Sequence, residues 1–434
     1  MESRRRTRRF ETLNQYIEDK WGEYYISFIM KYHNKSLNWG FISESPNLTL
    51  AVIKKYMNHT NIKWNWKYIS RNPNITIEFI KNHLDIKWDW CNISRNPNIT
   101  MDIIKDNLFT NWIKWDWYYI CNNPNFTLDM IDYYPNKSNY NWDWYSISIN
   151  TKITMDIIEE NNIKPWNWHA ISRNSNIDKE FINKYLDATW INPDWYGLSC
   201  NSNITMDIIE KYIDKPWNWG HLSKNPNLKI DFIEKYINNL KFKWCWWNIS
   251  KNKTITMDFI YKYIDKDWSW FNISSNSSIT LDIIEKYIDV EWAKWDWNGV
   301  SINPNLTLEF VEKHKDINWN WQWISSNPCI TMDMVEKYID AEWAKWNFKW
   351  LSLNPNLTIE FMERHPENET NHWKWDWISN HNFKKSKEEF YHKYYRIYMA
   401  TFKLQQYFNR MYDNPKYKFC RDRFNREWDA IMNN

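Results

Sequence analysis

Glycine is scarce in this sequence, with only five residues among 434. Phosphate-binding loops need several closely spaced glycines, and neither GxGxxG nor GxxxxGK[ST] is present, which argues against a nucleotide-dependent enzyme. The tight turns of β-hairpins also favour glycine, and the alternation of apolar and polar residues that is typical of strands is missing. The composition therefore favours a helical fold.

Paired cysteines and long apolar runs are missing as well. The six cysteines form no CxxC pair, so we interpret them as free thiols in a reducing compartment. No apolar run approaches the roughly 20 residues that span a bilayer, and no apolar signal region follows the basic N-terminus. These absences predict a soluble intracellular protein without membrane insertion.

Residues capable of catalysis or metal binding occur without a pattern. The ten histidines form no HExxH motif, and neither GxSxG nor a Cys/His arrangement supplies a nucleophile. The regularly placed carboxylates are explained as helix caps or solvated helix faces. We therefore expect no enzyme activity, no cofactor and no metal ion.

A tandem repeat dominates the sequence. The second aromatic residue of a Trp-x-Trp pair recurs fourteen times between Trp39 and Trp375, always 24 or 27 residues after the previous one. The three-residue difference is close to one helical turn, so both lengths keep the same face inward. We expect a repeat array over residues 37–383, a basic arm and helical cap over 1–36, and a basic, aromatic helical cap over 384–434.

Each repeat contains two helix-start signals. Around Trp90, Asp89 is placed as the N-cap, and Trp88 is placed to pack against Ile93 as a hydrophobic staple. The second helix follows an Asn-Pro-Asn turn, with Thr100 or Thr205 as the N-cap and an amphipathic pattern after it. The same interpretation gives the staple residues Trp64, Trp88, Trp115, Trp142, Trp166, Trp217 and Trp295 and the capping residues Asp89, Asp116, Asp143 and Asp296.

Two short helices cannot bury a core alone, whereas stacked pairs of helices form a continuous one. The predicted fold is therefore all-α, an α-solenoid of about fourteen two-helix repeats with helical caps at both ends.

The 35 tryptophans raise the alternative of a surface that stacks on sugars or bases. The first Trp of each pair recurs against an invariant apolar residue, so we interpret it as core. The two residues after the second aromatic, here called the first and second variable positions, change most between repeats. This variation is typical of a partner-contact surface, and drift at exposed positions is the alternative. The candidate contact residues are Lys67, Tyr68, Tyr118, Tyr119, His169, Trp247, Gln322, Trp323, Lys349, Trp350 and Trp377.

Charge is unevenly distributed along the chain. The net charge is +3, with +3 on residues 1–11 and +6 on residues 384–434, which leaves −6 between them. An acidic repeat body binds a phosphate backbone poorly, so nucleic acid is expected only at the basic termini. The first hypothesis is a non-catalytic scaffold for protein–protein interaction, and the alternative is nucleic-acid or glycan binding through exposed aromatic residues and the termini.

The repeat, with its Trp-Asp-Trp start, its Asn-Pro-Asn-Ile-Thr turn and its Met-Asp-Ile-Ile-Glu-Lys-Tyr-Ile-Asp helix, resembles Asn- and Trp-rich helical repeat proteins of giant DNA viruses of amoebae (Mimivirus-like). The resemblance covers residues 37–383, and Pro193, Lys229 and Phe348 depart from the pattern. It implies a repeat scaffold without catalytic residues, located in the host cytoplasm, a virus factory or the virion.

Overall fold

The computed structural model describes residues 2–108, 110–133, 142–185, 193–239, 241–368, 372–412, 414, 416–423 and 426, with residues 2–10, 132, 133, 185, 405 and 409 described as backbone only. All regular elements in these ranges are helices. A short helix begins at the second aromatic residue of each repeat, and we call these the inner helices: α2 (Trp39–Glu44), α4 (Trp66–Ile69), α6 (Trp90–Ser94), α8 (Trp117–Cys121), α10 (Trp144–Ile149), α12 (Trp168–Ile171), α14 (Trp195–Cys200), α16 (Trp219–Leu222), α18 (Trp246–Ile249), α20 (Trp270–Ser274), α22 (Trp297–Ser301), α24 (Trp321–Ser326), α26 (Phe348–Leu351) and α28 (Trp375–Ile378).

A second set, the outer helices, follows the Asn-Pro-Asn turns: α3 (Leu50–Tyr56), α5 (Ile77–Lys81), α7 (Met101–Asp106), α9 (Asp129–Tyr133), α11 (Met155–Glu160), α13 (Lys179–Tyr185), α15 (Met206–Lys211), α17 (Ile230–Tyr236), α19 (Met257–Lys262), α21 (Leu281–Lys286), α23 (Leu308–Lys313), α25 (Met332–Lys337) and α27 (Ile359–Arg364). Two long helices, α1 (Glu2–Lys31) and α29 (Lys384–Tyr412), begin and end the fold. Units are numbered 1 to 14 by their inner helices.

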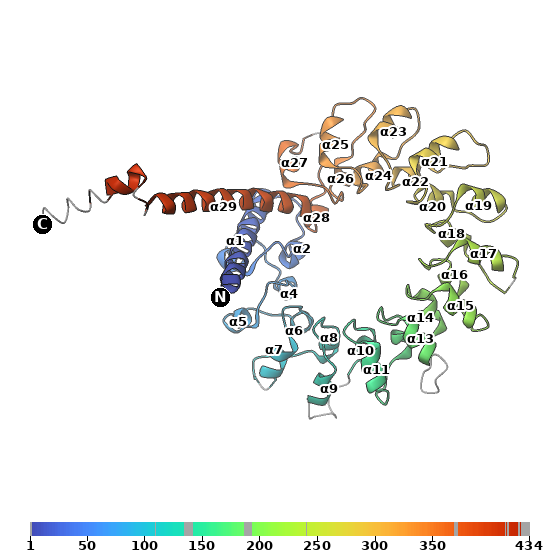
Figure 1. Ribbon diagram of the computed structural model, residues 1–434, viewed down its shortest axis with the longest axis horizontal. Coiled ribbons are helices and arrows are strands. Elements are labelled where there is room, and N and C mark those ends of the chain that lie inside the picture. The colour runs from blue at the N-terminus through green and yellow to red at the C-terminus, as the bar shows by residue number, and fades with distance from the viewer. Residues whose placement is uncertain are drawn as a thin grey trace.

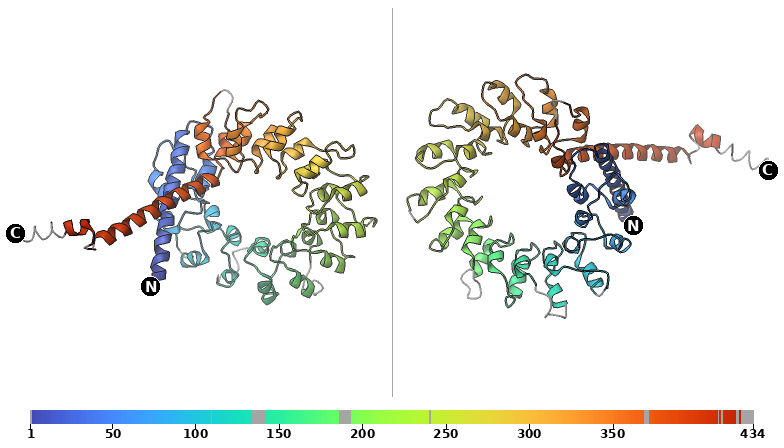
Figure 2. Two further views of the ribbon diagram at one scale, coloured as in Figure 1. Left: turned by 45° about the horizontal axis from the view of Figure 1, so that its top comes forward. Right: turned by 180° about the vertical axis from the view of Figure 1, so that it is seen from behind.

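The units form a ring, with the inner helices around its centre and the outer helices on its rim (Figures 1 and 2). Successive inner helices pack on one another, most extensively α20 on α22, α2 on α4, α10 on α12 and α24 on α26. Buried apolar residues of both sets, such as Ile93 and Ile104, join into one continuous core. The predicted repeat solenoid is confirmed. None of the described helices combines the length and apolar character needed to cross a membrane.

The two ends of the array meet, which the sequence did not indicate. At an ordinary boundary, the N-cap amide of one unit donates to the serine hydroxyl of the preceding inner helix, as Asn65 does to Ser43 Oγ at 3.0 Å. Unit 1 makes the same bond to unit 14, since Asn38 N donates to Ser379 Oγ at 2.8 Å. We call this boundary the junction. The repeat contact therefore continues around the whole ring.

Helix α1 lies across the junction. Its Lys31 pairs with Glu363 of α27 at 2.9 Å, and its Glu23 pairs with Lys55 of α3 at 2.7 Å. Phe28 packs edge-on against Phe383 with ring centroids 5.7 Å apart. Helix α29 packs on α1 at the same place. The terminal helices do cover the terminal units, but because the array closes, they do so at one junction.

Buried asparagines connect successive units. The amide of Asn303, the first residue of its turn, donates to the carbonyls of Ser274, Asn276 and Ile279 in the preceding unit at 2.8, 3.2 and 3.0 Å. The equivalent residues are Asn72, Asn96, Asn123, Asn150, Asn174, Asn201, Asn225, Asn276, Asn327 and Asn354. The sequence alone predicts only that these residues form turns. Their amides also satisfy backbone carbonyls that have no access to water.

Candidate interaction surface on the inner helices

The N-caps set where each inner helix begins. Asp89 accepts a hydrogen bond from Asn92 N at 2.9 Å, and Asp116, Asp143 and Asp296 accept equivalent bonds from amides of their own helices. This capping starts the helix directly after the cap residue and fixes which residues follow on its first turn. Cys245 and Lys374 occupy the same position without a side-chain cap bond.

The outer helices begin in the same manner at most turns. Thr100 Oγ1 accepts a hydrogen bond from Ile103 N at 3.3 Å. At Thr205, where the sequence also places a cap, the hydroxyl donates to Asp207 and makes no cap bond.

The staple tryptophans lie at the unit boundaries. Trp88 packs edge-on against Trp66 of the preceding unit, with centroids 5.5 Å apart and an interplanar angle of 76°. Its indole N–H donates to His83 O at 2.8 Å, so both the ring face and the polar edge are engaged. Trp166 and Trp217 are buried like Trp88, and Trp64, Trp115, Trp142 and Trp295 are half-buried. These rings contribute to packing between units.

In most units the residue at the first variable position is exposed to solvent. Tyr118 is 54% exposed and Trp247 is 50% exposed. The other candidates at this position, Lys67, His169, Gln322 and Lys349, are also exposed. Tyr145 and Tyr196 occupy it too and are exposed, although they are not among the candidates predicted from the sequence. Their register in the repeat was the signal that could have identified them.

The second variable position is less open. Tyr68, Tyr119, Trp323, Trp350 and Trp377 are all half-buried. The ring of Tyr68 lies over Gly40 of unit 1, where an added Cβ would come within 3.2 Å of it. In unit 3 this position is Asn92, whose amide donates to Lys67 O of the preceding unit at 3.0 Å. Side chains at this position therefore pack between units while exposing one edge.

In five units a cation that was not predicted as part of the surface lies four residues after the first variable position, on the same side of the inner helix. Lys251 Nζ lies 3.8 Å from the centre of the Trp247 ring. Arg95 lies 5.1 Å from the Tyr119 ring of the next unit, and Arg173 lies 5.3 Å from the Tyr196 ring of the next unit. Three cation–ring contacts thus lie along the inner helices between units 3 and 9.

Acidic caps balance most of this positive charge. From the N-cap to the residue four places beyond the first variable position, the fourteen inner segments contain eight Lys or Arg and seven Asp or Glu, a net charge of +1. His169 forms an ion pair with Asp194 of the next unit when it is protonated. The surface is therefore aromatic and close to neutral.

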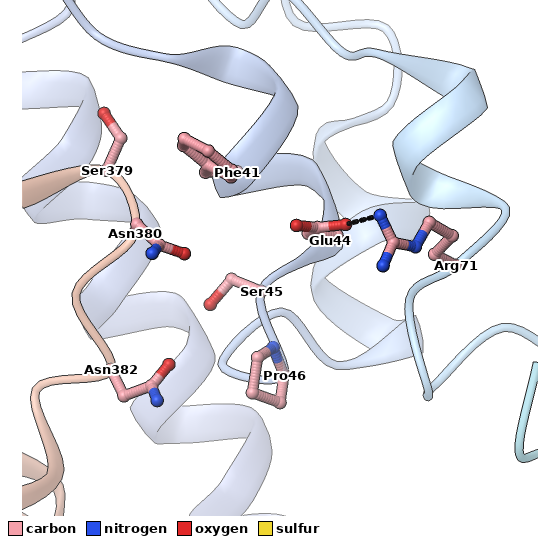
Figure 3. A pocket seen from close by; sticks show the side chains of 8 residues that line it. All are labelled: Phe41, Glu44, Ser45, Pro46, Arg71, Ser379, Asn380 and Asn382. Atoms are coloured by element: carbon pink, nitrogen blue, oxygen red, sulfur yellow. Dashed lines mark ion pairs between the residues drawn. The ribbon is translucent and has the colours of Figure 1, made fainter. Parts of the chain in front are cut away.

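Shallow polar pockets lie between adjacent inner helices. The pocket at the junction has a volume of about 260 Å³ and is lined by Phe41, Glu44, Ser45, Pro46, Arg71, Ser379, Asn380 and Asn382 (Figure 3). Glu44 and Arg71 form an ion pair of 3.1 Å along one side of it. Its walls are mostly polar, unlike those of a typical small-molecule site. Among the residues described, no three His, Cys, Asp or Glu side chains converge as metal ligands.

Comparisons with known proteins identify no relative of this chain. The chain matches no protein-family model, and neither a curated protein nor a solved structure is significantly similar to it.

Proposed function

We propose that the protein is a non-catalytic scaffold that binds a protein partner through the first variable positions of its inner helices. The observation that carries this proposal is the exposure of large aromatic side chains, foremost Tyr118 and Trp247, at one register of the repeat. Tyr, Trp and Arg dominate the binding energy of protein interfaces, and rigid aromatic side chains lose little entropy on binding.

The outer helices on the rim of the ring differ from the inner helices in the chemistry of their exposed side chains. Its exposed charges pair between neighbouring outer helices, as in Lys235–Glu210 at 2.7 Å and Lys262–Glu234 at 2.8 Å. Lys and Glu are depleted at protein interfaces relative to other surfaces. The surface of the outer helices is therefore less suited to binding a protein partner than the surface of the inner helices.

A capture experiment with matched variants tests the proposal. The first variant is Tyr118→Ser with Tyr196→Ser and Trp247→Ser, three exposed aromatic residues of inner helices. The control is Leu84→Ser with Ile163→Ser and Ile264→Ser, three exposed apolar residues in loops that follow outer helices. Both variants replace exposed side chains, so we expect both to fold like wild type.

Tagged wild type and both variants are purified from the natural host, and the bound proteins are quantified by mass spectrometry. We expect a partner that the inner-helix variant loses by at least about tenfold, because each hot-spot aromatic contributes about 2 kcal/mol or more. The control variant should retain that partner. Equal loss in both variants, or a partner that neither variant loses, contradicts the proposal.

The cation–ring contacts of the inner helices support a second candidate, single-stranded nucleic acid, because bases stack on aromatic side chains while cations contact phosphates. The net charge of +1 on the inner segments argues against it. Fluorescence anisotropy of a labelled single-stranded oligonucleotide at low salt measures whether the protein binds nucleic acid. Binding that Trp247→Ser weakens supports this candidate, and absence of binding removes it.

The cellular setting is proposed from the resemblance of the repeat alone. We place the protein in cells infected by a giant DNA virus, in the cytoplasm or virus factory, or in the virion. Immunofluorescence on infected amoebae, together with proteomics of purified virions, tests this placement.

A further inference from the structure

Helix α29 has two parts with different surroundings. In its first part, Phe390 packs against Trp21 and Tyr24 of α1 with centroids 5.5 and 5.6 Å apart, and Lys387 pairs with Glu18 at 2.8 Å. Beyond this first part the helix points away from the ring in every view (Figures 1 and 2). We call residues 396–412 the projecting segment. It is attached to the ring at one end only.

The projecting segment has an apolar side. Ile397, Leu404 and Met411 are spaced by seven residues, so they follow one another along one side of the helix, with Phe408 beside them. Ile397 is 53% exposed and Leu404 is 69% exposed. Exposed apolar side chains that form a continuous row mark an interaction surface more often than single ones do.

Positive charge borders this apolar side. Arg396, Lys403 and Arg410 are also spaced by seven residues and directly precede Ile397, Leu404 and Met411. Within the projecting segment these are the only charged residues, which gives it a net charge of +3. The tyrosines at 398, 407 and 412 add amphipathic rings. An apolar side with cations along its edge and tyrosines nearby is typical of helices that lie at a lipid–water interface.

We propose that the projecting segment binds the surface of an anionic lipid bilayer and lies in the plane of that surface. The row that contains Leu404 enters the acyl boundary, while Arg396, Lys403 and Arg410 extend to acidic headgroups. A second copy of the helix fits less well, because it brings the same cations and no acidic side chain. A nucleic acid fits less well, because phosphates leave the row of Ile and Leu exposed.

Flotation of the full chain with vesicles tests the proposal. Wild type should float with phosphatidylcholine vesicles that contain phosphatidylserine and stay behind with pure phosphatidylcholine. Changing Arg396, Lys403 and Arg410 to Gln should weaken partitioning roughly 100-fold, from about fivefold for each cation near an anionic surface. The matched control, Lys63→Gln with Lys87→Gln and Lys114→Gln, removes the same charge from exposed residues of the ring and should bind like wild type.

The apolar contribution is tested separately. Ile397→Ser with Leu404→Ser should weaken partitioning by at least about tenfold. Its control, Leu84→Ser with Ile163→Ser, should not. Circular dichroism verifies that every variant keeps the helix content of wild type.

Several outcomes overturn the proposal. One is wild-type protein that does not float with vesicles that contain phosphatidylserine. Another is a triple Gln variant that binds as well as its matched control. Sedimentation in which Leu404→Ser abolishes a dimer assigns the surface to a second copy instead. Oligonucleotide binding that needs Arg396, Lys403 and Arg410, without vesicle binding, assigns it to nucleic acid.

Discussion

Replacement of a buried turn asparagine should be far more damaging than replacement of its neighbour two residues later. Asn303 donates to three carbonyls of the preceding unit and accepts from Asn305 N at 2.9 Å. With about 1 kcal/mol for each hydrogen bond lost, and carbonyls left buried without donors, Asn303→Ala should cost about 3 to 4 kcal/mol. Asn305 donates to Ser277 O at 2.9 Å near solvent, so Asn305→Ala should cost about 1 kcal/mol.

Amide hydrogen exchange followed by mass spectrometry measures this difference locally, because a long repeat array need not unfold in one step. In the Asn303→Ala variant, peptides of α20 and α22 should lose most of their protection, and peptides on the opposite side of the ring should keep theirs. Equal loss of protection in the two variants would falsify the assignment of unit coupling to the buried asparagines.

Three further changes have defined outcomes. Phe28→Ala removes a buried ring from the junction and should cost about 3 to 5 kcal/mol there, seen as faster exchange in α28 and α2, and unchanged exchange contradicts this. Burial lowers the pKa of His381, whose ring accepts from Phe383 N at 2.9 Å. Its neutral form is therefore favoured on folding, so junction stability should be full above about pH 6.5 and fall as the pH drops through the lower folded pKa. His381→Asn, the residue that other units carry, should abolish this dependence in acid titrations followed by exchange. Burial raises the pKa of Cys121 to about 12, so a thiol reagent at pH 8 should label exposed Cys200 and leave Cys121 unlabelled until unfolding. Equal labelling rates in the native protein contradict this difference.

The repeat and its helix starts were predictable from the sequence because they depend on neighbours in the chain. Asp89 and Thr100 cap the helices that directly follow them, and fourteen copies make such a local pattern unambiguous. Ring closure was not predictable, because it depends on a small rotation between adjacent units that accumulates over the whole array. The pairing of Lys31 with Glu363 follows from that accumulated curvature and has no local signal.

The candidate surface was partly predictable for a similar reason. Variation between repeats identified the first variable position, where Tyr118 and Trp247 are exposed. The same variation could not show that the second variable position is half-buried. Whether Tyr68 packs against another unit depends on Gly40, 28 residues earlier in the sequence. Cations such as Lys251 were not predicted, because the residue type at their position changes from repeat to repeat. Only the helical turn brings them beside the rings.

Zero-length carbodiimide cross-linking of the monomer tests ring closure most directly, since it joins amines to carboxylates that are already in contact. In a closed ring we expect a Lys31–Glu363 cross-link across the junction, where the two groups lie 2.9 Å apart, and a Lys387–Glu18 cross-link at 2.8 Å. Lys313–Glu285, at 2.6 Å between neighbouring units, serves as the positive control. Recovery of the control cross-link without either junction cross-link would contradict the closed ring.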